Sequence, residues 1–367
     1  MGKQFEKAVS LAQLQKSAMR CRRGVRKKES VSNFCNKSIV RCKTLRDDIL
    51  SGNYSISKYV KFTIYEPKTR KILATRIRDR VWQESMIRNG VYDDLTRPNI
   101  YDNGACQVGK GTSFAIERTS ELPRRYYRKT GSNTGWACHL DAKKYFPSTP
   151  HKTSKSVISK TVGDPKFSEM LYEIIDSFTD ERSERQIADD IFGERGTGLG
   201  SPVSQLVQLA LPSRIDHYAK QNLHLKYYVR YNDDVLIWDE DKKKIADACE
   251  WIIAEAAKLG VTVVSKEGIY PIKRGLKFLQ KRFILTGSGK VVIRLPKDKL
   301  AGERRTLRGM KRKVDSGELT MDDVNSHYQS WVSGLLMTKS YGAVRATDKF
   351  FTETFRERPE YSFRKGK

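Results

Sequence analysis

Apolar residues alternate with polar ones in two short segments before residue 80. The period of two in Tyr59–Tyr65 and in Lys71–Arg76 is typical of half-buried strands. The residues between them, Glu66–Arg70, include a proline and turn-forming side chains, so the two segments predict a basic β-hairpin. Over Asp79–Gly90 the spacing of apolar residues changes to that of a helix.

Strands and helices alternate through the middle of the chain. Apolar runs predict strands, apolar residues three and four apart predict helices, and Asn232-Asp233-Asp234 between two apolar runs predicts a tight hairpin. In chain order we expect a strand over Leu140–Phe146, a helix from near Pro150, a helix over Pro202–Ala219, strands over Tyr227–Tyr231 and Val235–Trp238, a helix over Asp241–Leu259 and a strand over Val261–Val264. This order predicts an α+β fold, in which a sheet carries helices on one face.

Both ends of the chain are predicted to be basic and partly helical. Leu11, Leu14 and Met19 have helical spacing beside a cluster of cations, and from Lys297 a second helix carries more. The cations are Arg20, Arg22, Arg23, Arg26, Lys27 and Lys28 in the first cluster and Lys297, Lys299, Arg304, Arg305, Arg308, Lys311, Arg312 and Lys313 in the second. A solvated helix face is the alternative to a nucleic-acid contact in both places.

The composition points to a folded protein with a polyanionic partner. The 367 residues contain 70 Lys and Arg against 43 Asp and Glu, a net charge of +27, and 38% are hydrophobic. That hydrophobic share excludes a disordered polycation, and the charge favours nucleic acid over a basic surface that serves solubility alone.

Several classes of protein are excluded by what the sequence lacks. No apolar run approaches the roughly 18 residues of a membrane span, and MGKQFEKAVS has no apolar core of a secretory signal. The six cysteines show no CxxC and the five histidines no HxxxH, so neither a zinc site nor a disulfide framework is expected. We therefore expect a cytoplasmic protein with reduced thiols.

Two groups of aspartates stand beside predicted strands. Asp141 follows the apolar run Ala137–Leu140, and Asp233 and Asp234 occupy the predicted hairpin tip. Adjacent carboxylates repel one another unless solvent or a cation screens them, and phosphoryl transfer with two Mg²⁺ ions about 3.5–4 Å apart needs carboxylates from neighbouring strands. Plain turn chemistry at the hairpin and a helix cap at Asp141 are the alternatives.

A glycine-rich loop lies between these two groups of aspartates. Gly196–Gln205 runs through small residues into the helix predicted from Pro202. Glycine lets a backbone approach a ligand closely, and the start of a helix offers free N–H groups to phosphate or sugar oxygens. The loop therefore strengthens the interpretation of the aspartates as part of a nucleotide site.

Further motifs accompany these three, and all occur in one order. Tyr231-Asn-Asp-Asp234 is a Tyr-x-Asp-Asp box, and Asp141-Ala-Lys-Lys-Tyr-Phe-Pro-Ser148 is followed by His151. Others are Glu66–Arg70, Arg78-Asp79-Arg80, Tyr101–Thr112 (ending in Gly-Lys-Gly-Thr) and Ser330-Trp331. In this order the motifs resemble those of reverse transcriptases of bacteria and their phages, the group II intron-like family, over about residues 60–345.

The sequence of the glycine loop resembles one subgroup of this family in particular. It carries Leu199-Gly200 and Ser204-Gln205, where most relatives have Gln-Gly and Ser-Pro, and is similar to the loop of diversity-generating retroelement reverse transcriptases. In that subgroup the aliphatic residue is associated with misincorporation opposite template adenine, which the resemblance implies here. Two departures, Phe278-Leu-Gln-Lys281 for Phe-Leu-Gly-Phe and Asn232 in the Tyr-x-Asp-Asp box, keep defence-associated bacterial reverse transcriptases as an alternative.

The resemblance implies a role for each matched residue. Asp141, Asp233 and Asp234 are expected to be catalytic and to hold two Mg²⁺ ions, with Mn²⁺ as a substitute. Phe146 matches an aromatic that blocks a ribose 2′-OH, with an ordinary core aromatic as the alternative. The other expected dNTP contacts are Lys68, Arg70, Leu199, Gly200 and Gln205, and the expected nucleic-acid contacts are Lys110, Lys266, Arg304, Arg305, Arg308, Lys311 and Arg312.

The implied architecture is a right-hand polymerase of α+β class. We expect a basic N-terminal extension over 1–60, fingers over 61–135, a palm over 136–290 with a helical part at 150–190 that links to the fingers, and a helical basic thumb over 291–367. The implied reaction is RNA-directed DNA synthesis in a bacterial or phage-encoded setting, with an RNA template (a dedicated structured RNA), a DNA or RNA primer, dNTPs and an accessory protein as partners, and no membrane. We expect no ribonuclease H or integrase module after the thumb. The alternatives are a defence enzyme that works with a non-coding RNA, a non-catalytic RNA-binding protein and a template-independent nucleotidyltransferase.

Overall fold

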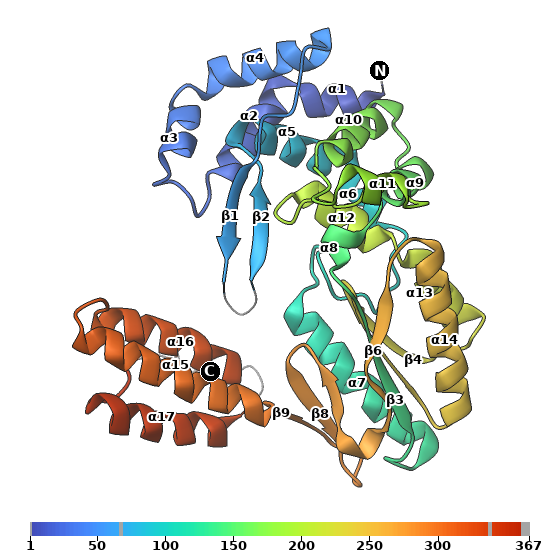
Figure 1. Cartoon of the computed structure of the whole chain (residues 1–367), viewed down its shortest axis with the longest axis vertical. Coiled ribbons are helices and arrows are strands. Elements are labelled where there is room, and N and C mark those ends of the chain that lie inside the picture. The colour runs from blue at the N-terminus through green and yellow to red at the C-terminus, as the bar shows by residue number, and fades with distance from the viewer. Residues whose placement is uncertain (1, 66–68, 337–339, 361–367) are drawn as a thin grey trace. The chain divides into compact units, whose positions relative to one another are not determined.

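The computed structural model describes residues 2–65, 69–336 and 340–360 (Figure 1). By compactness the chain divides into two units, each assembled from separate stretches of sequence. The first unit comprises Met1–Ala115, Leu140–Val235 and Lys243–Lys266, and the second comprises Ile116–His139, Leu236–Lys242 and Glu267–Lys367. The aspartate motifs and the glycine loop all belong to the first unit.

Helices at the start of the chain build the core of the first unit together with the helix that follows the hairpin. Leu14 and Ala18 lie one turn apart on the helix α2 (Leu11–Cys21) and are fully buried. Phe5 meets Trp82 edge-on at 5.8 Å between ring centroids and lies 5.7 Å from the ring of Phe167. The helices here are α1 (Lys3–Val9), α2 (Leu11–Cys21), α3 (Glu29–Asn36), α4 (Ser38–Ser51), α5 (Ile77–Met86), the π-helical turn η1 (Ile87–Val91) and α6 (Tyr92–Thr96). The predicted N-terminal extension therefore contributes to a core shared with α5.

The predicted hairpin is present as β1 (Val60–Ile64) and β2 (Arg70–Ala74). The two strands are antiparallel, in the register that places Phe62 opposite Ile72. Figure 1 shows them as blue strands that project from the helices α2 and α5 of the same unit.

A buried carboxylate holds the segment that leads into β1. Asp79, at the start of α5, is fully buried and accepts hydrogen bonds from the Tyr54 hydroxyl at 3.0 Å and from the backbone N–H of Ser57 at 3.1 Å. Arg78 beside it forms an ion pair with Asp48 at 2.8 Å. The Arg78-Asp79 motif thus anchors the base of the hairpin.

A four-stranded sheet in the order β4-β5-β3-β6 carries the predicted aspartates. Its strands are β3 (Trp136–Ala142), β4 (Tyr227–Tyr231), β5 (Asp234–Asp239) and β6 (Val263–Pro271). Figure 1 shows α13 and α14 beside this sheet, and Tyr218 of α13 stacks on Trp251 of α14 with ring centroids 4.2 Å apart. The helices between the strands are α8 (Tyr145–Ser148), α9 (His151–Thr161), α10 (Pro165–Asp176), α11 (Glu184–Ala188), α12 (Pro202–Ala210), α13 (Ser213–Gln221) and α14 (Lys242–Lys258).

The second unit combines a small antiparallel sheet with a helical bundle. The sheet has the order β7-β8-β9, and the bundle core includes Leu307, Tyr328 and Phe351. The elements are α7 (Thr112–Thr130, which begins in the first unit), the 3₁₀ turn η2 (Ile272–Arg274), β7 (Leu276–Phe278), β8 (Lys281–Leu285), β9 (Val291–Arg294), α15 (Lys297–Asp315), α16 (Met321–Leu336) and α17 (Tyr341–Phe355).

The α+β class is confirmed, and three predicted elements differ from the structure. The strand expected over Leu140–Phe146 is β3, which ends at Ala142 because Lys144 takes a left-handed conformation (φ +47°) and α8 begins. The helix expected over Pro202–Ala219 is two helices that divide at Pro212, which lacks the N–H that a helix interior requires. The last strand of the sheet begins at Val263 and continues to Pro271, beyond the expected end.

None of the helices in the described part of the chain is both long and apolar enough to cross a membrane.

Candidate active site

Two carboxylates and a lysine meet on three adjacent strands of the sheet. Asp141 lies in β3, Asp234 opens β5, and Lys266 lies in β6. Lys266 Nζ is 2.6 Å from Asp234 Oδ1 and 3.3 Å from Asp141 Oδ1. Asp233 precedes Asp234 in the hairpin turn. The fold therefore brings together aspartates that the sequence places far apart, with a lysine bridging two of them.

Burial and the concentration of negative charge together shift the pKa values of these groups. Burial, followed by the charge of Asp234, raises the pKa of Asp141. Burial raises the pKa of Asp233 to about 6, although a backbone hydrogen bond acts in the opposite direction. Burial also acts to lower the pKa of Lys266, but its hydrogen bond to Asp234 and the two negative charges raise it overall. Such a site favours any cation placed among the carboxylates.

A buried arginine holds the turn that carries the aspartate pair. Asn232, the residue before the pair, has φ +54°, a left-handed conformation that asparagine tolerates. The fully buried Arg230 donates through Nη1 to the carbonyl of Asn232 at 3.0 Å and through Nε to Asp216 Oδ2 at 2.7 Å. The hydroxyl of Tyr228 donates to the other Asp216 oxygen at 2.5 Å. The backbone of the turn is therefore bonded to a neutralised ion pair in the core.

The loop Tyr101–Thr112, which contains the predicted nucleic-acid contact Lys110, also reaches this turn. The hydroxyls of Thr112 and Tyr231 are 3.3 Å apart. Lys110 donates to the carbonyls of Tyr101 at 2.9 Å and Asn103 at 3.2 Å, and burial lowers its pKa. Its ammonium is thus bonded within its own loop in this structure, and a contact with nucleic acid stays a prediction.

The glycine loop is fastened to the segment that follows β3. His151 Nε2 donates to the carbonyl of Gly196 at 2.8 Å, and the backbone N–H of Thr197 donates to the carbonyl of Phe146 at 2.8 Å. Phe146 lies on α8 with its side chain half-buried, and Gln205 is exposed on α12. The structure therefore places Phe146 next to the loop in which the nucleotide contacts were predicted.

The hairpin contacts the other end of the same loop. The backbone N–H of Leu73 donates to the carbonyl of Leu199 at 2.9 Å. Gly200 has φ +117°, and a Cβ there would lie 3.1 Å from both Ile72 Cγ2 and the carbonyl oxygen of Leu73. Arg70 is exposed at the start of β2, and Lys68 lies outside the described residues. The loop and the hairpin thus form a continuous surface within the first unit.

A network of two arginines and two aspartates holds the segment before the glycine loop. Arg182 pairs with Asp180 at 2.6 Å and with Asp190 at 2.7 Å, and Arg195 pairs with Asp190 at 2.5 Å. Hydrogen bonds from Arg182 and the ion pair hold the pKa of Asp180 near 2, and bonds from Arg195 hold the pKa of Asp190 far below its usual range. Both carboxylates therefore remain ionised in the folded protein.

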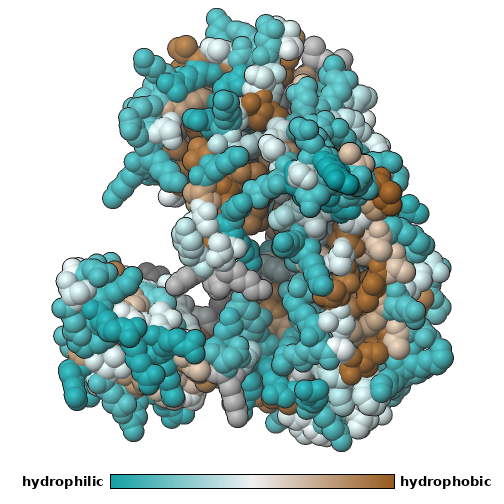
Figure 2. All heavy atoms as spheres, viewed as in Figure 1, coloured by the Kyte–Doolittle hydropathy of each residue, from teal (hydrophilic) through white to brown (hydrophobic). Residues whose placement is uncertain are grey.

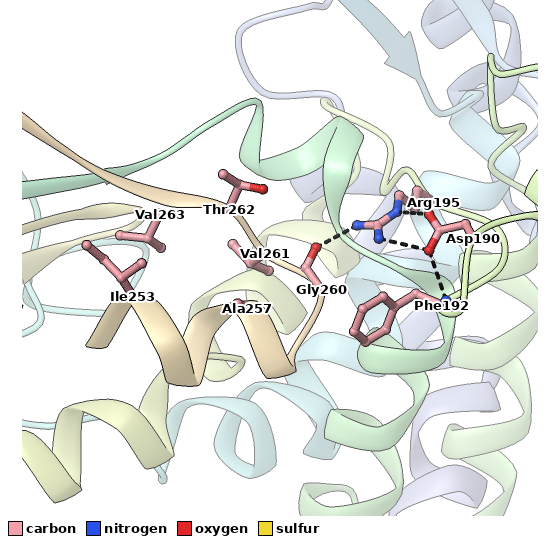
Figure 3. A pocket seen from close by; sticks show the side chains of 9 residues that line it. All are labelled: Asp190, Phe192, Arg195, Ile253, Ala257, Gly260, Val261, Thr262 and Val263. Carbon is pink, nitrogen blue, oxygen red and sulfur yellow. Dashed lines mark hydrogen bonds and ion pairs between the residues drawn. The ribbon is translucent and has the colours of Figure 1, made fainter. Parts of the chain in front are cut away.

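Arg195 extends this network to a pocket of about 460 Å³ beside β6 (Figure 3). Its Nη1 donates to the carbonyls of Ser148 at 2.8 Å and Gly260 at 2.5 Å. Hydrophobic residues gather at the surface around β6 and α14 (Figure 2), and Ile253 and Val263 are among those that line the pocket. Arg195 thus connects the start of the glycine loop to Ser148, at the end of α8, and to Gly260, which precedes β6.

The predicted nucleic-acid helix α15 belongs to the second unit. Arg305 and Arg312 are exposed, whereas Lys311 forms an ion pair with Asp315. Arg304 and Arg308 both lie over the ring of Phe350, at 5.4 and 5.2 Å from its centroid. The acidic residue Glu303 is buried and its carboxylate lies 3.0 Å from His327 Nε2. A cationic face remains on the helix.

The donor chemistry of the aspartate site suits Mg²⁺, because hard carboxylate oxygens are the ligands this ion prefers. Within residues 2–65, 69–336 and 340–360, however, no group of three or more His, Cys, Asp or Glu side chains is placed to hold one metal ion. The compensating charge in this structure is the ammonium of Lys266. Binding of two ions by Asp141, Asp233 and Asp234 therefore stays a prediction.

The polar residues that position the site were missed by sequence reasoning. Arg230 had a signal, since it is a single charge inside the apolar strand β4. Gln208 and Thr197 had none, because a glutamine on a helix and a threonine in a loop are ordinary. Arg195 and Asp190 likewise belong to no recognised motif.

The sequence matches no protein-family model and no curated protein. Among solved structures, the chain is similar to apo telomerase from Candida Tropicalis truncated from its C-terminal domain, with a TM-score of 0.47 and 11% identity. The match covers 66% of this chain and 55% of the telomerase chain. A likeness this distant carries no argument about chemistry, which the residues of the site must supply.

Proposed function

We propose that this chain is an RNA-directed DNA polymerase that adds dNMP units to a primer 3′-OH with release of pyrophosphate. The observation that carries the proposal is the meeting of Asp141 and Asp234, from adjacent strands, around Lys266 Nζ, with Asp233 next in the chain. Aspartates at the ends of neighbouring strands are what two-metal phosphoryl transfer requires. The order of the sequence motifs supports the same function.

Asp141, Asp233 and Asp234 are the proposed holders of two Mg²⁺ ions, which Mn²⁺ can replace. When bound, the ions supply charge neutralisation for the triphosphate and lower the pKa of the attacking hydroxyl. The chain itself contributes Lys266, whose ammonium lies at hydrogen-bonding distance from Asp234, and Arg230, which holds the turn beneath the pair.

The proposed nucleotide-binding residues lie in the first unit, as do the aspartates. The loop at Leu199 and Gly200, bonded to the hairpin that carries Arg70, is the proposed dNTP pocket, and Phe146 excludes a ribose 2′-OH. Gln205 and Lys68 complete the proposed nucleotide contacts, and Lys110 the template contacts. We propose a basic N-terminal extension, fingers, palm and helical thumb with the boundaries expected from the sequence. In this proposal α15 of the thumb binds duplex phosphates irrespective of sequence. The proposed partners are an RNA template, a primer and an accessory protein in a bacterial or phage-infected cytoplasm.

The test is dNTP incorporation by the protein purified with its own bound nucleic acid in the presence of Mg²⁺. The double variant Asp233→Asn/Asp234→Asn is expected to lose incorporation by at least about a hundredfold. Asp189→Asn, at an exposed position of the same unit, is the matched control and keeps activity. Wild-type protein that binds RNA tightly but incorporates nothing, with binding unaffected by the double variant, would contradict the proposal and favour a non-catalytic RNA-binding protein.

Sequencing of the product separates the subgroups. Leu199 in place of a glutamine removes a polar contact beside the incoming nucleotide, and we propose frequent misincorporation opposite template adenine as in diversity-generating retroelements. Leu199→Gln is then expected to lower errors at adenine relative to the other three bases. A product that is faithful or repetitive in both forms would instead support a defence-associated enzyme, and a product without a template a terminal nucleotidyltransferase.

A further inference from the structure

A buried amide is connected by hydrogen bonds to Phe146, the residue proposed to exclude a ribose 2′-OH. Gln208 of α12 is 2% exposed, and its Nε2 donates to Thr197 Oγ1 at 2.7 Å. The Thr197 hydroxyl donates in turn to the carbonyl of Phe146 at 3.2 Å, in parallel with the 2.8 Å bond from the Thr197 backbone N–H. Because the amide of Gln208 donates to the hydroxyl, the hydroxyl hydrogen is left to point at Phe146.

The same glutamine is connected to both ends of α8. Its backbone carbonyl accepts a hydrogen bond from the Tyr145 hydroxyl at 2.7 Å. Its Oε1 lies 3.2 Å from the hydroxyl of Thr149, the residue that follows α8. Both Tyr145 and Thr149 are buried. Gln208 and Thr197 therefore contact the residues before, at and after Phe146.

The helix that carries Phe146 depends on these contacts for its position. α8 contains only Tyr145–Ser148, and a single helical turn has little stability of its own. It also begins after Lys144, whose positive φ is uncommon for a residue with a side chain. A buried amide that is not hydrogen-bonded costs free energy. A shift of α8 that breaks the bonds of Gln208 is therefore unfavourable, and these bonds hold α8 in one position.

We propose that Gln208, acting through Thr197, is a positioning residue that sets the discrimination between deoxyribonucleotides and ribonucleotides. The inference rests on the proposed polymerase function and on Phe146 as the residue beside the sugar. A pocket that rejects one added hydroxyl must be held accurately, because a displacement of about 1 Å in a site costs about a hundredfold in rate. Neither Gln208 nor Thr197 needs to touch the nucleotide.

The experiment compares Gln208→Met and Thr197→Val with wild type by kcat/KM for a dNTP and for the matching rNTP on one primer and template. The ratio of the two values is insensitive to the fraction of protein that is folded. We expect it to fall by about tenfold in both variants. Thr197→Ser keeps the hydroxyl and is expected to keep the ratio.

The control is Thr153→Val, which removes a buried hydroxyl bonded to the carbonyl of Leu259 at 2.9 Å in the same unit. It is expected to cost stability and leave the ratio unchanged. An unchanged ratio in Gln208→Met and Thr197→Val, with normal dNTP incorporation, overturns the inference and leaves the polymerase proposal intact. Absence of dNTP incorporation by wild type overturns the polymerase proposal and the inference with it.

Discussion

Leu73 of β2 donates its backbone N–H to the carbonyl of Leu199 in the glycine loop, at 2.9 Å. The bond joins the hairpin to the loop through backbone atoms alone. Substitutions of side chains therefore affect it only where a new side chain would clash with the hairpin or the loop. Gly200 is the place where intrusion matters, since a Cβ there would lie 3.1 Å from Ile72 Cγ2 and from the Leu73 carbonyl oxygen.

Gly200→Ala is therefore expected to lower the free energy of unfolding by about 1–3 kcal/mol, because φ is +117° and the hairpin must shift. The proposed dNTP pocket changes shape with it, so KM for dNTP is expected to rise. Urea unfolding and steady-state incorporation measure the two effects. Gly163→Ala, where a Cβ meets no atom within 4 Å, is the control. It is expected to leave KM unchanged and to raise the free energy of unfolding by no more than about 1 kcal/mol.

The acid stability of the first unit should depend on Asp180. Its folded pKa is about 2, below the roughly 3.9 of an unfolded chain, so it stabilises the fold fully above that higher value. The contribution is lost as the pH falls from about 4 to 2, when the unfolded state binds the proton first. Removing the group should therefore flatten the decline of stability with acid.

Urea unfolding at several pH values between about 2 and 5 tests this for Asp180→Asn against wild type. The difference in free energy of unfolding between the two proteins is expected to shrink as the pH falls. Asp189→Asn, whose ion pair with Arg185 is 3.9 Å long and exposed, should run parallel to wild type throughout. A constant difference for Asp180→Asn would show that its ion pairs do not control the acid response.

Local sequence patterns were sufficient for the elements that carry the candidate site. The hairpin at Asn232–Asp234 follows from two apolar runs around turn residues, and Asp141 follows from its place after an apolar run. Each of these patterns covers only a few consecutive residues. It can be recognised in the sequence because the residues that face the core of the protein are apolar. The length of β6 could not be predicted, because strand pairing with β3 and not local composition decides where it ends.

The positioning network could not be predicted for a different reason. Gln208 bonds Thr197 and Arg230 bonds Asp216, and each pair is separated by a stretch of chain that sets its geometry. A buried polar side chain has many potential partners in the sequence, and only the fold selects the few that it bonds. The bonds from Lys110 to carbonyls of its own loop were likewise not predicted from the sequence.

Stability and activity should separate at the buried ion pair. Arg230→Met leaves the carboxylate of Asp216 buried without its cation, and we expect a loss of about 3–5 kcal/mol in the free energy of unfolding. Adding Asp216→Asn removes the isolated charge and is expected to restore part of that loss, because Tyr228 can still donate to the amide oxygen.

Activity should not return with stability, because the carbonyl of Asn232 still lacks its donor. Urea unfolding gives the first quantity, and primer extension per folded molecule gives the second. Full recovery of both in the double variant would mean that the bond from Arg230 to the turn is unimportant for catalysis. Recovery of stability alone is the expected result.

The cationic face of α15 predicts a specific dependence on salt. Arg305 and Arg312 are exposed, whereas Lys311 already pairs with Asp315. Each phosphate contact removed should reduce the slope of log affinity against log salt by roughly 0.9. Arg305→Ala/Arg312→Ala is therefore expected to weaken binding of an RNA–DNA duplex and to lower the slope by nearly two units, equally for every sequence tested.

Fluorescence anisotropy with a labelled duplex at several salt concentrations measures that slope. Lys349→Ala on α17, an exposed lysine 3.9 Å from Glu353, is the matched control and should leave the slope unchanged. Lys311→Ala should have a smaller effect than either arginine, because its ammonium is already paired with Asp315 and is less available to a phosphate. A slope that does not change in the double arginine variant would assign α15 to a solvated surface and place the duplex on other cations of the chain.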